Sequence, residues 1–429
     1  MDTMINDLKD KKICILGFGK EGRSAYNYLT KNGITNIKVH DGKEQEVDGV
    51  YGENYLDNLD EYDVIIKSPG ISLFDRDITS YQDKITSQLE LLLKYSKYNI
   101  IGITGSKGKS TTTSLIYEML KANGLDAHIM GNIGIPIFDT FDELNDDSYL
   151  VIEMAALQLE YVHHSPHIAV MTNLFEEHLD HFLTLDNYYN AKMQIMRFQN
   201  ENDYAIYSID NNDLKERVNK LNYKGHLIPT SINNVKDDYV IIDNKKVYNV
   251  NDKRNIIGKH NLINIIEALN VANILKLDMN KCAEAINNFK SLPHRMQNVG
   301  TFNGITFYDD AIATIPQATI DCIDALGTVD TLITGGKDRG IDYQDLIDYI
   351  NNSKITNVIC MPETGYNIAP YLNKKVFKIE DLEYAVKLAK KITKKGCICL
   401  LSPSASSYNQ FKNFEEKGNF FQQYVKSDN

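Results

Sequence analysis

Short apolar runs that end in glycine-rich or polar turns recur along the chain and predict an α/β protein. The first run, residues 12–16, passes into the turn G-F-G-K-E-G-R, and a helical stretch over residues 24–31 leads to a second run at 37–40. Such a strand–helix–strand unit with a G-x-G-x-x-G-like turn suits a pyrophosphate at the helix N-terminus. The turn alone is compatible with NAD, FAD or a nucleotide sugar, and also with a tight bend that binds nothing. A further run at 64–67 ends in S-P-G-I, a rigid turn at the sheet edge where such folds bind ligands.

The run I-I-G-I-T-G-S-K-G-K-S-T-T-T predicts a phosphate-binding loop. Gly105 and Gly108 have no Cβ atoms, so successive backbone N–H groups can turn toward one anion. The following helix N-terminus adds partial positive charge, Lys109 adds a full charge, and Ser110 offers an oxygen to Mg²⁺. The strict G-x-x-x-x-G-K-[ST] spacing would need glycine where Ile103 stands. The alternative is a Gly/Ser-rich turn that binds no ligand. The combination of a strand, two glycines, a lysine and a hydroxyl residue makes this alternative less favoured.

Two further chemical groups follow strands near this loop. Glu153 ends the apolar run 149–152, where a Walker-B-type carboxylate can hold Mg²⁺ directly or through water. His178 follows the run 168–171, within N-L-F-E-E-H-L-D-H-F, and can reach the same sheet edge. Each has a mundane alternative: Glu153 as a surface charge at a strand end and His178 as a helix-capping histidine. Their joint placement beside one phosphate loop favours a shared site.

The rest of the chain continues the α/β pattern. Residues 237–251 predict a β-hairpin, and the helical stretch from Gly258 places Asn261 and Asn264 on one face. A second hairpin is predicted around Asn303-Gly304. Three strands follow at 331–333, 358–360 and 397–401, with turns G-G-K-D-R-G and S-P-S-A-S-S-Y-N-Q-F at the carboxyl edge of a parallel sheet.

We therefore predict three α/β domains. Residues 1–95 form a Rossmann-like domain, residues 96–295 a central P-loop ATPase-like domain, and residues 296–429 a C-terminal Rossmann-like domain.

Composition narrows the class of protein. The chain has 429 residues, of which 43% are hydrophobic and 24% charged, as in ordinary globular proteins. Its net charge of −12 argues against binding to nucleic acid or to an anionic membrane surface, so anionic ligands must be held by local basic groups. The sequence contains no run long enough to span a bilayer and no signal-peptide core, and its six cysteines have no metal-ligand spacing. We expect a cytoplasmic protein with reduced thiols and no membrane insertion.

In order and spacing, these motifs resemble the muramyl ligase (Mur) family along the whole chain. The phosphate loop also resembles that of a relative, folylpolyglutamate synthase. The closing run, L-S-P-S-A-S-S-Y-N-Q-F-K-N-F-E-E-K-G, resembles the glutamate-adding member of the family. The other matching runs are S-P-G-I at Ser68, T-G-S-K-G-K-S-T at Thr104, G-N-I-G-I-P at Gly131, E-M-A-A-L-Q-L-E at Glu153, N-L-F-E-E-H-L-D-H at Asn173, Y-Y-N-A-K at Tyr188, G-K-H-N-L-I-N at Gly258 and P-H-R-M at Pro293.

The resemblance implies an activity. ATP phosphorylates the carboxylate of UDP-N-acetylmuramoyl-L-alanine, and the amino group of glutamate displaces phosphate to form an amide. The three predicted domains would bind the UDP-sugar, ATP and the amino acid in that order along the chain. We expect a monomer that uses ATP and two Mg²⁺ ions.

The resemblance also implies residue roles. Catalysis is assigned to Lys109, Glu153, His178 and Lys192, and metal binding to Ser110, Glu153, His178 and Lys192. ATP binding is assigned to Gly105, Ser106, Lys107, Gly108, Lys109, Ser110, Thr111, Asn261, Asn264, Arg295 and Asp310. The UDP-substrate contacts are Gly19, Asp41, Ser68 and Asn132, and the amino-acid contacts are Thr314, Arg339, Ser407, Tyr408 and Phe414.

Lys192 matches the family lysine that is carbamylated by CO₂. A bare ammonium would repel Mg²⁺, whereas the carbamate is an anion that can organise the second metal region. The alternative is an ordinary surface lysine on a helix.

Three departures from the family pattern concern substrate contacts. Ala155-Ala156 replaces a Ser-Ser pair, Ile312 replaces a lysine near the incoming amino acid, and Gly42-Lys43 replaces a Thr-Arg pair near uracil. We predict D-glutamate as the added amino acid. An L-glutamate-adding variant is the main alternative, and a folylpolyglutamate synthase-like ligase is disfavoured because it needs no βαβ domain before the phosphate loop. An NAD-dependent oxidoreductase would have no need of Lys109 or Glu153.

Overall fold

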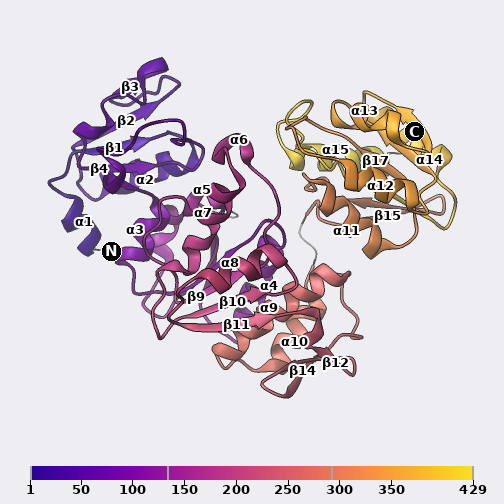
Figure 1. Ribbon diagram of the computed structural model, residues 1–429, viewed down its shortest axis with the longest axis horizontal. Helices are drawn as coiled ribbons and strands as arrows, with labels where there is room; N and C mark the ends of the chain where they lie inside the picture. The colour runs from indigo at the N-terminus through magenta and orange to yellow at the C-terminus, as the bar shows by residue number, and fades with distance from the viewer. Residues whose placement is uncertain (1, 133–134, 291–292, 428–429) are drawn as a thin grey trace. The chain divides into compact units, whose positions relative to one another are not determined.

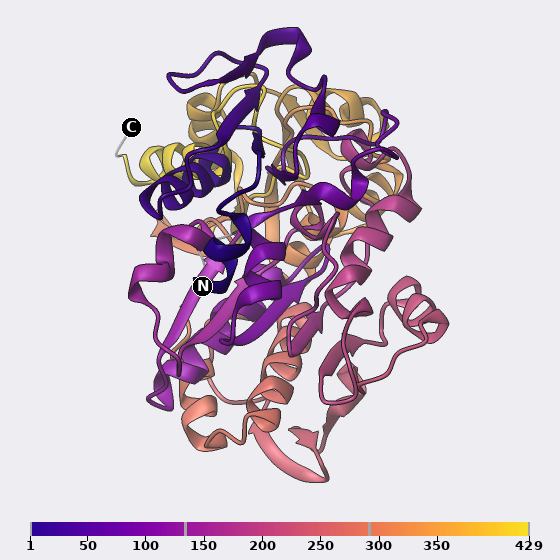
Figure 2. The ribbon, with the colours of Figure 1, turned by 90° about the vertical axis from the view of Figure 1, so that its left-hand side faces the viewer.

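The first sheet belongs to the βαβ unit predicted from the G-F-G turn. The computed structural model describes residues 2–132, 135–290 and 293–427, and its chain can be followed in two views (Figure 1 and Figure 2). Five parallel strands lie in the order β3-β2-β1-β4-β5. They are β1 (Ile13–Leu16), β2 (Ile37–Asp41), β3 (Gly49–Tyr51), β4 (Val64–Lys67) and β5 (Ile85–Thr86), with helices α1 (Asp2–Leu8), α2 (Lys20–Lys31) and α3 (Gln88–Tyr95).

Helix α2 begins at Lys20, earlier than the predicted start at residue 24. Its first turn contains Gly22, where a Cβ atom would lie 2.0 Å from the backbone oxygen of Gly17. The last glycine of the G-x-G-x-x-G-like turn is therefore a helical residue that lets helix and turn approach closely.

The second sheet carries the predicted phosphate loop. Six parallel strands lie in the order β11-β10-β9-β6-β8-β7. They are β6 (Asn99–Thr104), β7 (Ala127–Gly131), β8 (Tyr149–Glu153), β9 (Ile168–Met171), β10 (Tyr204–Ser208) and β11 (His226–Thr230). The helices are α4 (Lys109–Ala122), α5 (Ala156–Leu159), α6 (Leu179–Phe182), α7 (Leu185–Arg197), α8 (Asn212–Lys220), α9 (Lys259–Ile274) and α10 (Met279–Asn288).

Both predicted hairpins are confirmed. Strands β13 (Tyr239–Ile242) and β14 (Lys245–Asn249) pair antiparallel, with β12 (Val235–Lys236) as a third strand. Strands β15 (Gln297–Phe302) and β16 (Ile305–Asp309) pair antiparallel at the edge of the last sheet.

The last sheet has six strands in the order β15-β16-β20-β17-β18-β19. Apart from the β15–β16 hairpin its pairs are parallel, with β17 (Val329–Thr334), β18 (Asn357–Cys360), β19 (Lys375–Lys378) and β20 (Ile398–Leu401). Alternate residues of these strands enter two cores, with Ile333 in one and Leu332 in the other, so both faces are covered. The covering helices are α11 (Pro316–Leu326), α12 (Gln344–Asn352), α13 (Thr364–Ile368), α14 (Leu382–Ile392) and α15 (Phe414–Lys426).

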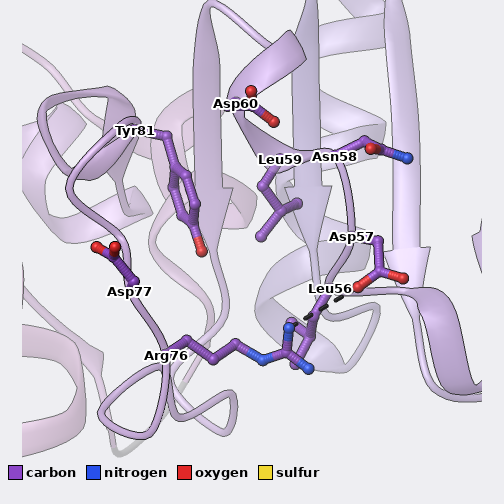
Figure 3. Close-up of a pocket in the computed structure, with 8 residues that line it drawn as sticks. All are labelled: Leu56, Asp57, Asn58, Leu59, Asp60, Arg76, Asp77 and Tyr81. Atoms are coloured by element: carbon purple, nitrogen blue, oxygen red, sulfur yellow. Dashed lines mark ion pairs between the residues drawn. The ribbon is translucent and has the colours of Figure 1, made fainter.

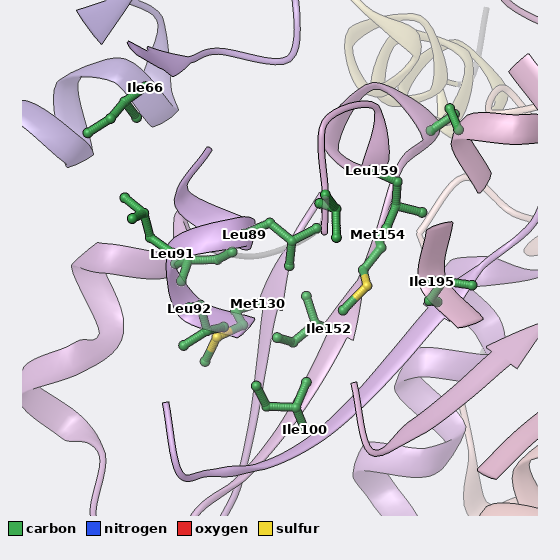
Figure 4. Close-up of a cluster of buried hydrophobic side chains, with 14 of the residues drawn as sticks. Ile66, Leu89, Leu91, Leu92, Ile100, Met130, Ile152, Met154, Leu159 and Ile195 are labelled. Atoms are coloured by element: carbon green, nitrogen blue, oxygen red, sulfur yellow. The ribbon is translucent and has the colours of Figure 1, made fainter. Parts of the chain in front are cut away.

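The chain forms two compact units. The first comprises residues 1–252 and 263–287, and the second comprises residues 253–262 and 288–429. In the first unit, Ile66 of β4, Leu89 of α3 and Ile152 of β8 belong to one buried cluster (Figure 4). Side chains of the first two sheets thus share a core, and the domain boundaries near residues 95 and 295 stay predictions.

No helix in the described parts of the chain is both long and apolar enough to cross a membrane.

One buried carboxyl predicts a pH-dependent stability. Glu267 of α9 is fully buried, and neither carboxyl oxygen has a hydrogen-bond partner within the described residues. Burial raises its pKa from the ordinary 4.5 to about 8. Between these values the folded protein keeps the proton and the unfolded chain releases it, so stability falls as the pH rises through this window and levels off above it.

We expect Glu267→Gln to remove most of this loss. The free energy of unfolding of the wild type should fall by about 3 kcal/mol more than that of the variant between pH 5 and pH 8. Urea unfolding at both pH values measures the difference, with the exposed Glu118→Gln on α4 as the matched control. Parallel pH profiles for wild type and Glu267→Gln would contradict the prediction.

Candidate active site

The phosphate loop joins β6 to α4 and contains two glycines that no other residue could replace without strain. Gly105 has φ +146°, and a Cβ there would lie 1.9 Å from Thr172 Oγ1. Gly108 has φ +83°, and a Cβ there would lie 2.4 Å from Asn264 Oδ1. The loop backbone therefore approaches Thr172 and Asn264 closely, and the ATP contact of Asn264 stays a prediction.

Lys109 begins α4 and folds back over the loop. Its Nζ donates to the backbone oxygens of Gly105 and Ser106, each at 2.9 Å. Ser110 and Thr111 are buried in the first turn of the helix. The loop therefore brings an ammonium, a helix N-terminus and a hydroxyl residue together, which is the arrangement that binds a polyphosphate.

The segment after β9 holds the phosphate loop in place. Asn173 accepts from Lys107 N through Oδ1 at 2.7 Å, and its Nδ2 donates to Lys107 O at 3.1 Å. Ser106 Oγ donates to Phe175 O at 2.9 Å and accepts from Phe175 N at 2.8 Å. This support for the loop was not predicted, although Asn173 opens one of the motifs quoted for the family resemblance.

Glu177 is a further residue beside the loop that the sequence did not indicate. Its Oε1 lies 3.0 Å from Lys107 Nζ, and its Oε2 accepts from Tyr188 OH at 3.3 Å. Burial alone would raise the pKa of Glu177, but the charges of Lys107, Lys109 and His178 outweigh burial and lower its pKa to about 2. Glu177 is therefore an anion that balances the cations around the loop. The only sequence signal was its place directly before His178.

Glu153 ends β8 and is 1% exposed. Its Oε1 accepts from Asn132 Nδ2 at 2.6 Å, while its Oε2 is buried without a hydrogen-bond partner among the described residues. A buried carboxylate oxygen left unpartnered near a phosphate loop fits a Mg²⁺ ligand. Asn132 follows β7 of the same sheet, whereas Ile133 and Gly134 of the G-N-I-G-I-P run lie outside the described residues.

His178 precedes α6 as its N-cap residue, with φ 56°. Its ring centroid lies 5.9 Å from that of Tyr188, and Tyr188 OH is 3.1 Å from Ser106 Oγ in the loop. The backbone turns sharply at His178, and its ring contacts Tyr188, which itself contacts the phosphate loop; the metal-binding role of His178 stays a prediction.

Lys192 of α7 is buried at 2% exposure, which excludes the surface-lysine alternative. Its Nζ donates to Gly105 O at 2.8 Å and lies 4.8 Å from the ring centroid of Tyr188. Burial and the charge of Lys109 lower the pKa of Lys192 well below its ordinary value. The lowered pKa shifts the side chain of Lys192 toward the neutral amine, which is the form that reacts with CO₂.

The remaining predicted ATP contacts belong to the second unit. Asn261 Nδ2 donates to Ile257 O at 2.7 Å. Burial, together with the charge of Arg295, lowers the pKa of His260 to about 4. The imidazole of His260 is therefore neutral near pH 7. Asp310 is 4% exposed and accepts from Met296 N at 3.1 Å and Ser402 Oγ at 2.9 Å; burial raises its pKa to about 7.

Three predicted UDP contacts lie at strand ends of the first sheet. Asp41 accepts from Phe18 N at 2.6 Å and Lys43 N at 2.8 Å, so it shapes the turns after β1 and β2. Ser68 Oγ donates to Gly17 O at 2.7 Å. A Cβ at Gly19 would meet nothing within 4 Å, which leaves open space at the N-terminus of α2. The fourth, Asn132, belongs to the second sheet and bonds to Glu153.

A separate polar pocket lies beside the first sheet. Figure 3 shows Leu59 and Tyr81 pointing into it, with Arg76 turned toward Asp57 at 3.8 Å. None of the predicted UDP contacts lines this pocket within the described part of the chain. The lining residues are Leu56, Asp57, Asn58, Leu59, Asp60, Arg76, Asp77 and Tyr81.

The predicted amino-acid contacts all belong to the second unit and differ in exposure. Ser407 is 3% exposed, and its Oγ has no hydrogen-bond partner within the described residues. Tyr408 is 67% exposed, and Arg339 is also exposed. Phe414 begins α15 with its ring 6.4 Å from that of His294, while Thr314 is half-buried before α11.

Comparisons with known proteins agree with this geometry. The Mur ligase middle domain family matches residues 103–272, and the Mur ligase, glutamate ligase domain family matches residues 294–405. The UDP-N-acetylmuramoylalanine--D-glutamate ligase of Clostridium botulinum strain Langeland is 32% identical over 449 residues, covering 97% of each chain. The Oenococcus oeni protein of the same name is 32% identical over 441 residues, covering 100% of this chain and 99% of that protein.

A solved structure shares the fold. The MurF ligase of Thermotoga maritima in complex with ADP has a TM-score of 0.59 and 19% sequence identity, and the match covers 98% of this chain and 96% of that one. The chain belongs to the Mur ligase family, the ATP-dependent ligases of peptidoglycan precursor synthesis. The predicted fold class, with parallel-sheet α/β domains of the Mur type, is confirmed.

Proposed function

We propose that the protein joins D-glutamate to UDP-N-acetylmuramoyl-L-alanine at the expense of ATP. The observation that carries the proposal is the cluster at Gly105, whose backbone oxygen accepts from both Lys109 and Lys192. Glu153 adds a buried carboxylate oxygen with no partner among the described residues. A polyphosphate cradle with an acidic metal ligand suits phosphoryl transfer, and relatives at 32% identity bear the D-glutamate ligase name.

The proposed reaction has two steps. A carboxylate oxygen of the L-alanyl group attacks the γ-phosphorus of ATP, and the bond from that phosphorus to the bridging oxygen breaks to release ADP. The amine of glutamate then attacks the acyl carbon, the acyl carbon–oxygen bond breaks, and phosphate leaves with that oxygen as the amine loses a proton. Two anions meet in the first step, so Lys109 and the loop amides would compensate the charge of the transferring group.

No three His, Cys, Asp or Glu side chains group as a metal site within the described residues, so a divalent cation would draw on the unpartnered Oε2 of Glu153, on a hydroxyl and on phosphate oxygens. Ser110 and Glu153 would hold one Mg²⁺, and His178 with a carbamylated Lys192 would hold a second. When bound, Mg²⁺ would neutralise phosphate charge and orient the oxygens for transfer. Glu177 would keep Lys107 and the loop in register through its ion pair.

Carbamylation of Lys192 is supported by its position and follows simple chemistry. The amine lone pair attacks the carbon of CO₂, a nitrogen–carbon bond forms, one oxygen gains the negative charge, and a proton leaves the nitrogen. The product is an anion next to Gly105, where a protonated Lys192 beside Lys109 would be costly.

The identity of the amino acid rests on the second unit. Ile312 stands where the family pattern has a lysine, so one cation that could pair with a glutamate carboxylate is missing from that loop. Arg339 is exposed and could supply charge instead. The names of the relatives favour D-glutamate over the L isomer.

The proposal is tested by phosphate release from ATP. UDP-N-acetylmuramoyl-L-alanine is supplied with D-glutamate or L-glutamate, and folate with L-glutamate forms a third arm. We expect release only with the UDP-substrate and D-glutamate. Preference for L-glutamate would make the protein the L-adding variant, turnover of folate would make it a folylpolyglutamate synthase-like ligase, and no release in any arm would contradict the proposed function.

A further inference from the structure

A buried ion cluster lies outside the phosphate-loop site in the first unit. Lys67 Nζ lies 2.9 Å from Glu160 Oε2, and His181 Nε2 lies 3.1 Å from the same oxygen. The side chains of Lys67 and Glu160 are each 3% exposed, and that of His181 is 9% exposed. Removing the charges of Lys67 and Glu160 from water is costly, so their burial is weak evidence that the pair adds stability. We call these three residues the Glu160 cluster.

The three members come from three segments with predicted roles in the site. Lys67 is the last residue of β4 and directly precedes Ser68 of the S-P-G-I turn. Glu160 directly follows α5, which in turn follows the strand that ends at Glu153. His181 lies in α6, whose N-cap residue is His178. One carboxylate oxygen therefore joins the turn predicted to contact the UDP-sugar to the helix that carries His178.

Neighbouring contacts strengthen both connections. Ser72, just after the S-P-G-I turn, donates through Oγ to the backbone oxygen of His181 at 2.9 Å. The ring of Phe74 lies 5.5 Å from that of Phe182 and 6.2 Å from that of His181. The strand-end turn and α6 thus meet directly through a hydrogen bond and ring contacts, and they are also linked through Glu160, which contacts Lys67 and His181.

A second connection runs from α5 to α2. Gln158 Nε2 donates to Glu21 Oε1 at 2.7 Å, and Gln88 Nε2 donates to Glu21 O at 2.6 Å. Helix α2 begins directly after Gly19, so this link reaches a second predicted UDP contact. The short helix α5 is therefore fixed on one side to the G-F-G turn and on the other to the S-P-G-I turn.

The ion pair of Lys31 and Asp142, in the same unit, lies on the surface and not in the core. Lys31 of α2 and Asp142 also lie in contact at 2.6 Å, but their side chains are 65% and 76% exposed. An exposed ion pair of this kind contributes little to the free energy of unfolding and does not hold its two segments at a fixed spacing. It offers a matched control, because it too joins the helix of the first sheet to a segment that follows β7.

We propose that Glu160 is a positioning residue that holds the S-P-G-I turn and the His178 helix at a fixed spacing, so that a UDP-linked carboxylate held at the turn reaches the phosphate loop. This inference rests on the proposed function, since the substrate must extend from the UDP contacts to the γ-phosphate. An error of about 1 Å in such an alignment can cost roughly a hundredfold in rate.

The test uses three variants of the full chain. Glu160→Gln keeps the shape and removes the charge, Lys67→Met removes the partner, and Lys67→Met/Glu160→Leu replaces the buried ion pair by apolar groups. Lys31→Gln is the control. Hydrogen exchange without substrate reports on residues 68–74 and 178–182, and steady-state kinetics report KM for the UDP-substrate and for ATP.

We expect faster exchange in both segments for all three variants and unchanged exchange in the phosphate loop. KM for the UDP-substrate should rise at least about tenfold while KM for ATP stays within about twofold. With Glu160→Leu alone added to complete the double-mutant cycle, its effect and that of Lys67→Met should not add in the double variant, because each breaks the same contact. Lys31→Gln should match the wild type in every readout.

Wild-type exchange and wild-type KM in the three variants would overturn the inference. If the single variants do not fold, the apolar double variant decides, since a rescued fold with normal KM would make the cluster purely structural. A wild-type protein that does not ligate the UDP-substrate would refute the proposed function instead. Faster exchange in both segments would still establish that Glu160 couples the turn to α6.

Discussion

Replacing Lys109 by alanine is expected to lower turnover by roughly 10³-fold while leaving the fold intact. The Nζ of Lys109 lies over the loop, 2.9 Å from the backbone oxygens of Gly105 and Ser106, and the variant would leave the charge of the transferring phosphoryl group uncompensated. Turnover at saturating ATP measures the effect, and thermal unfolding checks the fold.

Lys121→Ala is the matched control for this prediction. Lys121 is exposed in the last turn of the same helix. Its replacement by alanine removes the same charge as Lys109→Ala does, but far from the phosphate loop. Near-normal turnover of Lys109→Ala at saturating ATP would show that the phosphate-loop assignment is wrong. A comparable loss in Lys121→Ala would mean that net charge, and not position, matters.

Lys192→Glu is expected to retain more activity than Lys192→Ala or Lys192→Arg. If the carbamate is the working form, the position needs a negative charge next to Gly105, and glutamate supplies one while alanine and arginine do not. Turnover of the three variants measures the order. Arg197→Glu, an exposed substitution on the same helix, is the control for added negative charge.

A bicarbonate experiment separates the modification from simple electrostatics. Removing CO₂ should lower the activity of the wild type, and bicarbonate should restore it, with no effect on Lys192→Glu. Equal activity of Lys192→Ala and Lys192→Glu, both close to wild type, would contradict any role of Lys192 in the site despite its burial.

Several central strands could be predicted from the sequence, whereas two edge strands outside the predicted hairpins, β11 and β19, could not. Strands β1 and β9 are continuous apolar runs, and β6 is buried from Ile100 onward, because parallel strands inside a sheet are covered on both faces. Strand β11, at a sheet edge, reads H-L-I-P-T and is mostly exposed, so it carries histidine and proline. Strand β19 reads K-V-F-K and lies at another edge. The residue pattern of neither strand differs enough from that of a loop for a strand to be predicted.

The phosphate loop could be predicted because its chemistry is local. Glycine, lysine and hydroxyl residues stand within a few positions, and the helix follows at once. The role of Glu177 was not predictable, because it depends on how the segment after β9 folds onto the loop. Lys67 and Glu160 are 93 positions apart in the sequence, and no periodic pattern of residues predicts a contact between them.

The most direct test of the proposed ligase chemistry follows an oxygen atom. UDP-N-acetylmuramoyl-L-alanine labelled with ¹⁸O in its carboxylate is incubated with ATP, Mg²⁺ and D-glutamate, and the released phosphate is analysed by mass spectrometry. An acyl phosphate pathway transfers one labelled oxygen to each phosphate and leaves the other in the new amide. Unlabelled phosphate, formed by water attacking ATP, would contradict the proposal.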